Sequence, residues 1–317
     1  MTAHIHGDIS GGLRADRALN ASLDMSAPYI GALANRDFVK MNGLGNEIVV
    51  VDLRGAPQPI EPAAARAAAR QERYDQLMAL YPARGNADAA VRIYNSDGSE
   101  AGACGNGMRC VAALVAGETG RADVNFETAG GIISCRRAGT DLFTVDMGRP
   151  RWRWDEIPLA REFADTGAIE LSYGPPGAPI LKSPSAVSMG NPHAIFWVDD
   201  PEAYDLAAIG PVLEHDRLFP ERANITLAAI PSRQRVVIRT WERGAGLTQA
   251  CGSAACAVAV AAARLDRTDR RVTVGLAGGE LAIEWRASDD HVLMTGPVAY
   301  EHKGRFDAAL FADLGAA

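Results

Sequence analysis

Ala103-Cys104-Gly105-Asn106-Gly107 and Ala250-Cys251-Gly252-Ser253 are the two stretches that decide how this chain is built. Both read Ala-Cys-Gly-polar, and they lie 147 residues apart in a chain of 317. A small-residue segment follows each of them and predicts a helix, over 110–117 in the first case and 254–264 in the second. Each cysteine is therefore expected just before a helix.

The repeat extends beyond the cysteines. A self-match at one fixed offset indicates duplication, and this period is too long for a solenoid. The sequence predicts two homologous halves, each running strand, Gly-Asn turn, strand, loop, Cys-Gly-polar, helix. The further matches are Arg92 with Arg239, Tyr94 with Trp241, Val111-Ala112 with Val258-Ala259 and, near the same offset, Gly45-Asn46 with Gly190-Asn191.

Alternating and β-branched segments predict strands, and Glu61-Pro62 opens a further helix that is expected to reach about residue 73. Residues 1–35 hold scattered charges and no sustained period, so a poorly ordered leader is expected there. The predicted strands cover 38–41, 48–52, 91–94, parts of 125–151, 186–189, 194–198, 235–241, 272–274, 281–285 and 292–294.

Composition excludes several classes of protein. The net charge of −7 argues against a general nucleic-acid binder. The longest near-apolar run, 250–263, is too short to span a bilayer, and no secretory signal opens the chain, so no membrane partner is expected. Only Lys40, Lys182 and Lys303 could carry a pyridoxal Schiff base. Five cysteines in a long chain favour free thiols in a reducing cytoplasm.

Cys104 and Cys251 differ from the other cysteines in their surroundings. A helix N-terminus carries unpaired N–H groups and a partial positive charge, which is expected to lower a thiol pKa and to hold a carboxylate. If the halves face each other, two thiols flank one carbon, and one removes a proton while the other delivers one. Such a pair inverts a stereocentre without a cofactor. For Cys110, Cys135 and Cys256, in apolar segments, simple packing is predicted.

Six motifs in order resemble the diaminopimelate epimerase family, over about residues 38–304. They are Phe38-Val39-Lys40-Met41-Asn42-Gly43-Leu44-Gly45-Asn46, Tyr94-Asn95-Ser96-Asp97-Gly98-Ser99-Glu100, Ala103-Cys104-Gly105-Asn106-Gly107-Met108-Arg109-Cys110, Met189-Gly190-Asn191-Pro192-His193, Arg222-Ala223-Asn224-Ile225, and Glu242-Arg243-Gly244-Ala245-Gly246 followed by Ala250-Cys251-Gly252-Ser253.

The resemblance implies a cofactor-independent, metal-free two-base epimerase that interconverts LL- and meso-2,6-diaminoheptanedioate for lysine and peptidoglycan synthesis. In the LL-to-meso direction Cys251 would be the thiolate acceptor and Cys104 the thiol donor. His193 and Glu242 match residues that tune the thiol pKa values. The implied substrate contacts are Asn46, Gln76, Asn95, Asn191, Asn224, Glu242 and Arg243, with carboxylate cradles at Gly105-Asn106 and Gly252-Ser253.

The implied fold is α+β, with two pseudo-symmetric halves. Each half is a mostly antiparallel closed sheet around a central helix, and the C-terminal strand returns to the first half. The expected bounds are 36–148 plus 296–317 for the N-terminal half and 149–295 for the C-terminal half, with the active site in the cleft between them. A cytoplasmic homodimer is also implied, although His302 replaces a tyrosine linked to dimer contacts.

Two alternatives stay open. Proline and hydroxyproline racemases share the two-cysteine fold, but their substrates lack a distal ammonium and carboxylate for Glu242-Arg243 to bind. A non-enzymatic thiol redox or metal-binding protein is the second alternative. The chain has no Cys-x-x-Cys and no zinc-type His/Cys spacing, which disfavours that interpretation.

Overall fold

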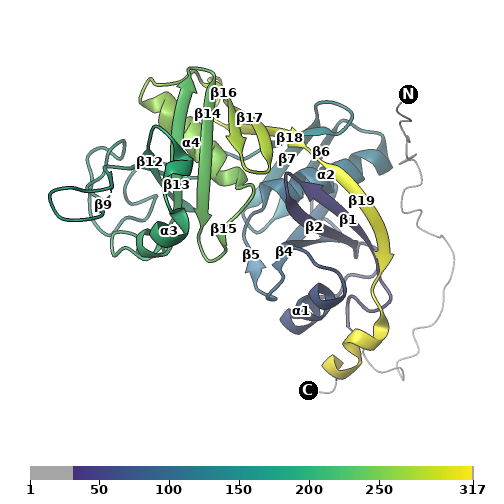
Figure 1. Ribbon diagram of the computed structural model, residues 1–317. Coiled ribbons are helices and arrows are strands. Elements are labelled where there is room, and N and C mark those ends of the chain that lie inside the picture. The colour runs from purple at the N-terminus through teal and green to yellow at the C-terminus, as the bar shows by residue number, and fades with distance from the viewer. Residues whose placement is uncertain (1–30, 316–317) are drawn as a thin grey trace, which may run out of the picture. The chain divides into compact units, whose positions relative to one another are not determined.

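The computed structural model describes residues 31–315, and these form two compact units. Among the described residues, the first unit holds 31–43, 47–143 and 298–315, and the second holds 44–46 and 144–297. Both units consist of a sheet with one helix packed inside it (Figure 1). The predicted halves, 36–148 plus 296–317 and 149–295, differ from these units by a few residues at each boundary. The division into functional domains stays a prediction.

The first unit places helix α2, Gly105–Thr119, against strands β1, β3, β6 and β7. Its other elements are β1 Asp37–Gly43, β2 Asn46–Asp52, α1 Pro62–Gln71, β3 Gln76–Tyr81, β4 Ala89–Asn95, β5 Glu100–Ala101, β6 Asp123–Thr128, β7 Gly131–Arg137, β19 Ala299–Arg305 and the 3₁₀ helix η2 Ala308–Gly315. Strand β8, Leu142–Asp146, begins in the first unit and continues into the second at Thr144.

The second unit places helix α4, Gly252–Arg264, against strands β11 to β14 and β16 to β18. Its elements are β9 Ser172–Tyr173, β10 Leu181–Lys182, β11 Ser185–Ser188, β12 Pro192–Trp197, the 3₁₀ helix η1 Pro201–Ala203, α3 Leu206–Glu214, β13 Asn224–Ser232, β14 Arg235–Glu242, β15 Gly246–Leu247, β16 Arg271–Leu276, β17 Gly279–Trp285 and β18 Val292–Pro297.

The strands of the two units share one order of pairing. In the first unit β2 pairs parallel with β3, β3 antiparallel with β4, β4 parallel with β6, and β6 antiparallel with β7. In the second, β12 pairs parallel with β13, β13 antiparallel with β14, β14 parallel with β16, and β16 antiparallel with β17. The same sequence of parallel and antiparallel pairs confirms the predicted α+β fold with two repeated halves.

The last strand returns to the beginning of the chain, as the resemblance implied. β19 pairs antiparallel with β1, with Arg305 opposite Asp37 and Ala299 opposite Asn42. An Arg305–Asp37 ion pair, Nε to Oδ1 at 2.6 Å, closes the end of this ladder. Strands far apart in sequence thus share the first sheet.

Small side chains allow the sheets to close around the central helices. Every residue of α4 from Ala254 to Ala262 is buried, and most of them are alanine or valine. α2 is buried from Asn106 to Ala112 and ends at Gly120, whose φ of +71° provides a left-handed cap. Both helices are preceded directly by a repeated cysteine at the N-cap position.

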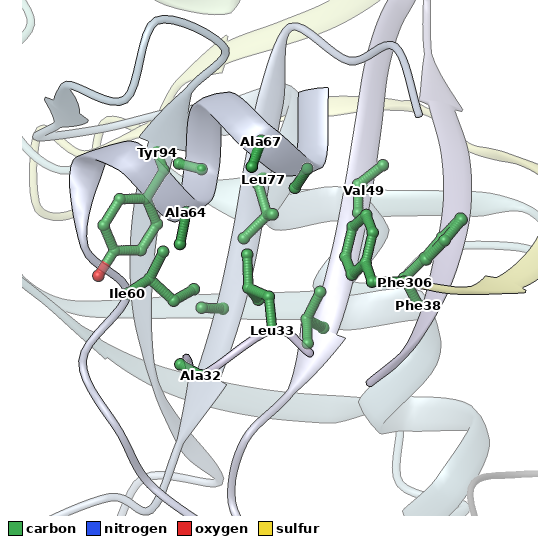
Figure 2. Packing of buried hydrophobic residues seen from close by; sticks show 14 of the residues in the cluster. Ala32, Leu33, Phe38, Val49, Ile60, Ala64, Ala67, Leu77, Tyr94 and Phe306 are labelled. Atoms are coloured by element: carbon green, nitrogen blue, oxygen red, sulfur yellow. The ribbon is translucent and has the colours of Figure 1, made fainter. Parts of the chain in front are cut away.

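The predicted leader is corrected at its end. The structure buries Ala32 and Leu33 in the core of the first unit, where Leu33 packs in one cluster with Leu77 of β3, Ala67 of α1 and Phe306 (Figure 2). Packing against the sheet removes the apolar surface of this alanine and leucine from water, which is favourable. Residues 1–30 lie outside the described residues.

The turn Leu44–Asn46 belongs to the second unit, although the sequence places it inside the first half. A Cβ added at Gly45 would lie 3.0 Å from the Gln249 Cβ, and one at Gly278 would lie 2.1 Å from the Leu44 carbonyl oxygen. This turn is therefore packed directly against the loop that leads to Cys251. Asn46 is carried by the same turn.

Candidate active site

The first half-site forms around the Cys104 thiol, in the first unit. Cys104 is the N-cap of α2, and its Sγ accepts from the Gly107 N–H at 3.3 Å. The thiol also lies 3.5 Å from Gln76 Oε1, and Gln76 Nε2 donates to Asn95 Oδ1 at 3.4 Å. Gln76 begins β3 and Asn95 ends β4, where the two are partners in the ladder. The structure thus brings three predicted site residues together.

The start of α2 provides the cradle predicted at Gly105-Asn106. The helix begins at Gly105, so its first N–H groups lack intrahelical partners. The Asn106 side chain is buried and accepts from the buried Arg109 Nη1 at 3.0 Å, so its Oδ1 is held inside the unit. A Cβ at Gly107 would lie 2.6 Å from Met78 Sδ and 3.2 Å from the thiol, which explains a glycine there.

The second half-site forms around Cys251, in the second unit. Its Sγ lies 3.5 Å from Ser253 Oγ, which in turn accepts from Asn191 Nδ2 at 3.3 Å. Asn191 Oδ1 lies 3.0 Å from His193 Nε2. A chain of polar contacts therefore connects the thiol, the cradle residue Ser253 and the two predicted residues of the Gly-Asn-Pro-His turn.

Asn224 joins the same half-site to the Glu242-Arg243 pair. Its side chain is buried, donates to the Pro192 carbonyl at 3.1 Å and accepts from the Arg243 backbone N–H at 2.9 Å. The Arg243 guanidinium donates to the Glu221 carbonyl at 2.9 Å. The partly exposed Arg243 side chain retains further donors for a carboxylate.

Electrostatics at Cys251 differ from the sequence-based expectation. Burial and the neighbouring Glu242 carboxylate raise the pKa of the Cys251 thiol well above its usual value. Ser253 and the Ala254 N–H of the helix N-terminus act in the opposite direction. The prediction that the helix start lowers this pKa is therefore wrong for Cys251, because desolvation of a thiol that is 4% exposed outweighs the helix.

Thr248 is a site residue that sequence reasoning missed. Its hydroxyl donates to Glu242 Oε1, and with Cys251 it lines a cavity of ≈ 140 Å³ in the second unit. A lone threonine in a turn carries no sequence signal. Its contact fixes one carboxylate oxygen of Glu242 beside the thiol.

His193 is neutral at ordinary pH. The imidazole is fully buried, and burial, with a smaller contribution from the Arg243 charge, lowers its pKa to about 3. Among the described residues its Nδ1 has no hydrogen-bond partner, while Nε2 contacts Asn191. His193 therefore acts on its surroundings as a hydrogen-bonding group and not as a cation.

The two half-sites are built on equivalent positions. Gln76 faces Asn95 across β3 and β4, while Asn224 and Glu242 stand one step beyond the partners Ile225 and Trp241 on β13 and β14. The first site is thus lined by neutral amides and the second by an amide and a carboxylate. Each offers a thiol beside a helix N-terminus, which suits proton transfer next to a carboxylate.

The remaining cysteines pack in the core, as predicted. Cys110, Cys135 and Cys256 are all buried. Burial raises the pKa of Cys110 to about 12. Within residues 31–315 no three His, Cys, Asp or Glu side chains gather as a metal site. No helix in that part of the chain is both long and apolar enough to cross a membrane.

Comparison with known proteins gives matches over most of the chain. The sequence profile of the family described as diaminopimelate epimerase matches residues 38–153 and 185–301, one segment in each half. A protein of Rhodopseudomonas palustris named diaminopimelate epimerase is 63% identical over 284 residues, which covers 89% of this chain and 97% of that protein. One of Afipia carboxidovorans, with the same name, is 62% identical and covers 89% and 99%.

Solved structures share the fold at low sequence identity. A predicted epimerase from Pseudomonas aeruginosa is 22% identical, with a TM-score of 0.61 over 86% of this chain and 99% of that one. A probable proline racemase from Agrobacterium radiobacter is 13% identical, with a TM-score of 0.64 over 88% and 95%. These likenesses support the two-unit fold alone.

Proposed function

Because the chain belongs to the diaminopimelate epimerase family, we propose that it interconverts LL- and meso-2,6-diaminoheptanedioate. It is an isomerase of the amino-acid epimerase type, in a family that works without pyridoxal phosphate. The observation that carries the proposal is the repeated thiol at a helix N-terminus, once in each unit, within a chain 63% identical to a protein of that name.

We propose a two-base mechanism. In the LL-to-meso direction the Cys251 thiolate takes the α-proton, and the electron pair of the broken C–H bond stays on the carbon next to the carboxylate. The Cys104 thiol then gives its proton to the opposite face. The reverse reaction exchanges these roles, so no oxidant or co-reactant is needed. The helix N-termini at Gly105-Asn106 and Gly252-Ser253 would stabilise the negative charge on the carboxylate.

Substrate recognition is assigned by charge. Arg243 would bind the distal carboxylate, and Glu242 would accept from an ammonium group. The neutral side chains of Asn46, Gln76, Asn95, Asn191 and Asn224 would contact both kinds of group without adding charge. The held geometry of Asn224, Arg243 and Glu242 in the second unit supports this assignment.

A wider role is proposed on the same basis. The product would serve lysine and peptidoglycan precursor synthesis, and the expected location is the cytoplasm. A homodimer is proposed because six of the seven residues of β19 are exposed, with Tyr300 48% exposed, although the strand belongs to the first sheet. Sedimentation at several concentrations tests the dimer, and a monomer throughout would contradict it.

Incubation in D₂O tests the activity. LL-diaminopimelate should gain deuterium at one α-carbon while the meso isomer accumulates, as followed by NMR and chiral chromatography. L-proline serves as the matched control. It has no distal ammonium or carboxylate, so Glu242 and Arg243 would lack partners and no racemisation is expected. Racemisation of proline with no change in diaminopimelate would replace the proposal with the racemase alternative.

A further inference from the structure

Glu214 is a buried carboxylate with no part in the proposed proton transfer. It is the last residue of α3 and is 3% exposed. A negative charge at a helix C-terminus is unfavourable, since the helix dipole is negative there. Burial of a carboxylate adds a further cost unless donors surround it. Its position is therefore poorly explained by the stability of α3.

Three donors converge on this carboxylate. The Trp241 indole Nε1 donates to Oε2 at 2.7 Å, while the Gly244 backbone N–H at 3.0 Å and Arg222 Nη1 at 3.2 Å donate to Oε1. Trp241 and Gly244 stand immediately before and after Glu242-Arg243. The Glu214 carboxylate thus accepts hydrogen bonds from the residues on both sides of Glu242-Arg243, the pair proposed to bind the substrate.

The second segment held by Glu214 leads to Asn224. Arg222 has a φ of +60°, a conformation that costs free energy for a residue with a side chain, and its guanidinium is held by Glu214. The Ala223 N–H donates to the Glu214 carbonyl at 3.3 Å. From this segment Asn224 and the Glu221 carbonyl contact Arg243. Both segments around Arg243 therefore depend on one residue.

The seat of Trp241 explains how α3 reaches this turn. A Cβ at Gly210 would lie 2.4 Å from Trp241 Cγ, so the indole lies directly against the helix backbone. This contact fixes the position of the Trp241 indole on α3, so that its N–H reaches Glu214. A larger residue at position 210 would move the ring away from the carboxylate.

We propose that Glu214 is a positioning residue that fixes Glu242 and Arg243 for the reaction by binding Trp241 and Gly244 on either side of them, an inference that rests on the proposed function. It acts through the backbone of the turn and through the indole. Glu214 would thus position two groups: the Glu242 carboxylate beside the Cys251 thiol, and the Arg243 guanidinium that would bind the distal substrate carboxylate.

The variant Glu214→Gln tests this assignment. The amide keeps the size of the side chain but turns an NH₂ group towards one of the donors. The protein should stay folded, and kcat/KM should fall about 10- to 100-fold for both isomers, because small displacements of positioning groups have effects of this size. Glu280→Gln is the matched control, since Glu280 forms an exposed ion pair with Arg235 in the same unit. It should keep wild-type kinetics.

A second readout separates positioning from a general loss of stability. Glu242 is the charge that acts most strongly on Cys251, so movement of Glu242 should shift the pH dependence of Cys251 alkylation to lower pH. Peptide mass spectrometry measures this without any turnover. Trp241→Phe, which removes one donor, should shift the curve in the same direction. The double variant should lose no more than about twofold beyond Glu214→Gln alone, because both changes act on one contact.

Wild-type kinetics and an unshifted alkylation curve in a folded Glu214→Gln protein would overturn the inference. If that variant does not fold, the same two results in Trp241→Phe would overturn it. If the wild-type protein does not epimerise diaminopimelate, the proposed function fails, while the alkylation curves still decide the role of Glu214.

Discussion

Cys251 is held between groups of opposite effect on its thiolate. Glu242 and burial disfavour the anion, while Ser253 and the N–H at the start of α4 favour it. If Glu242 pairs with a substrate ammonium group, as proposed above, that positive charge offsets the carboxylate and favours the Cys251 thiolate.

Glu242→Gln should make Cys251 more reactive in the free protein. Loss of the negative charge removes one of the two causes that raise its pKa, so the thiolate fraction at pH 8 increases. Iodoacetamide labelling at that pH should modify Cys251 several times faster than in the wild type, while turnover falls. Cys104, in the other unit, is the internal control. Slower labelling of Cys251 would contradict the electrostatic assignment.

His193 should make the second unit acid-sensitive. Its pKa is about 3 when folded and about 6.5 when unfolded, so below pH 6.5 the unfolded chain binds a proton that the folded chain does not. The free energy of unfolding should then fall as the pH drops, by about 2 kcal/mol between pH 7.5 and pH 5. Above pH 7 this histidine has no effect on it.

His193→Gln, which keeps a hydrogen-bonding group for Asn191, should remove this contribution. Urea titrations at pH 7.5 and pH 5 should show a smaller difference in the variant than in the wild type. An equal pH dependence in the variant and in the wild type would contradict the assignment of this contribution to His193.

Several elements are not predicted from the sequence, each for a physical reason. β3 and β13 pair parallel with β2 and β12, and their buried runs, Gln76–Tyr81 and Asn224–Ser232, lack the alternation that marks a half-exposed strand. α3 contains Gly210 and Pro211, which both disfavour helices. β19 is exposed along its length and carries no apolar pattern. The predicted strands and helices are all present.

Two helical glycines allow a matched test of element packing. Gly117 of α2 is exposed, with nothing within 4 Å of an added Cβ, so Gly117→Ala should raise the free energy of unfolding by about 0.5–1 kcal/mol. Gly210→Ala gains the same propensity but places a methyl 2.4 Å from Trp241. It should lower the free energy of unfolding by about 1–3 kcal/mol. Denaturant titration measures both, and an equal gain in both would contradict the close packing of α3.

Duplication is the property of the whole molecule that the sequence reveals best. The match of Cys104 with Cys251 predicted two halves, and the structure repeats the order of parallel and antiparallel pairs in both. Hydrogen bonds link several residues that the family resemblance implied, among them Gln76 with Asn95 and Asn191 with Ser253, while their role in substrate binding stays a prediction. The pKa of Cys251 was not predictable, because burial depends on packing that spacing does not reveal.

Two thiols in two units should divide the reaction between them. If each serves one face of the same α-carbon, Cys104→Ala and Cys251→Ala each remove one proton carrier, and each should lower epimerisation by about 10²–10⁴-fold. The fold should persist, because Cys104 is only partly buried and alanine fills most of the Cys251 site.

Exchange of the α-proton with D₂O separates the two variants. Cys104→Ala should still exchange the LL isomer through Cys251, and Cys251→Ala should still exchange the meso isomer through Cys104. Cys256→Ala, which removes a buried thiol of α4 that the proposed mechanism does not use, should epimerise normally. Near-normal turnover in either single variant would show that one thiol, or another base, serves both faces.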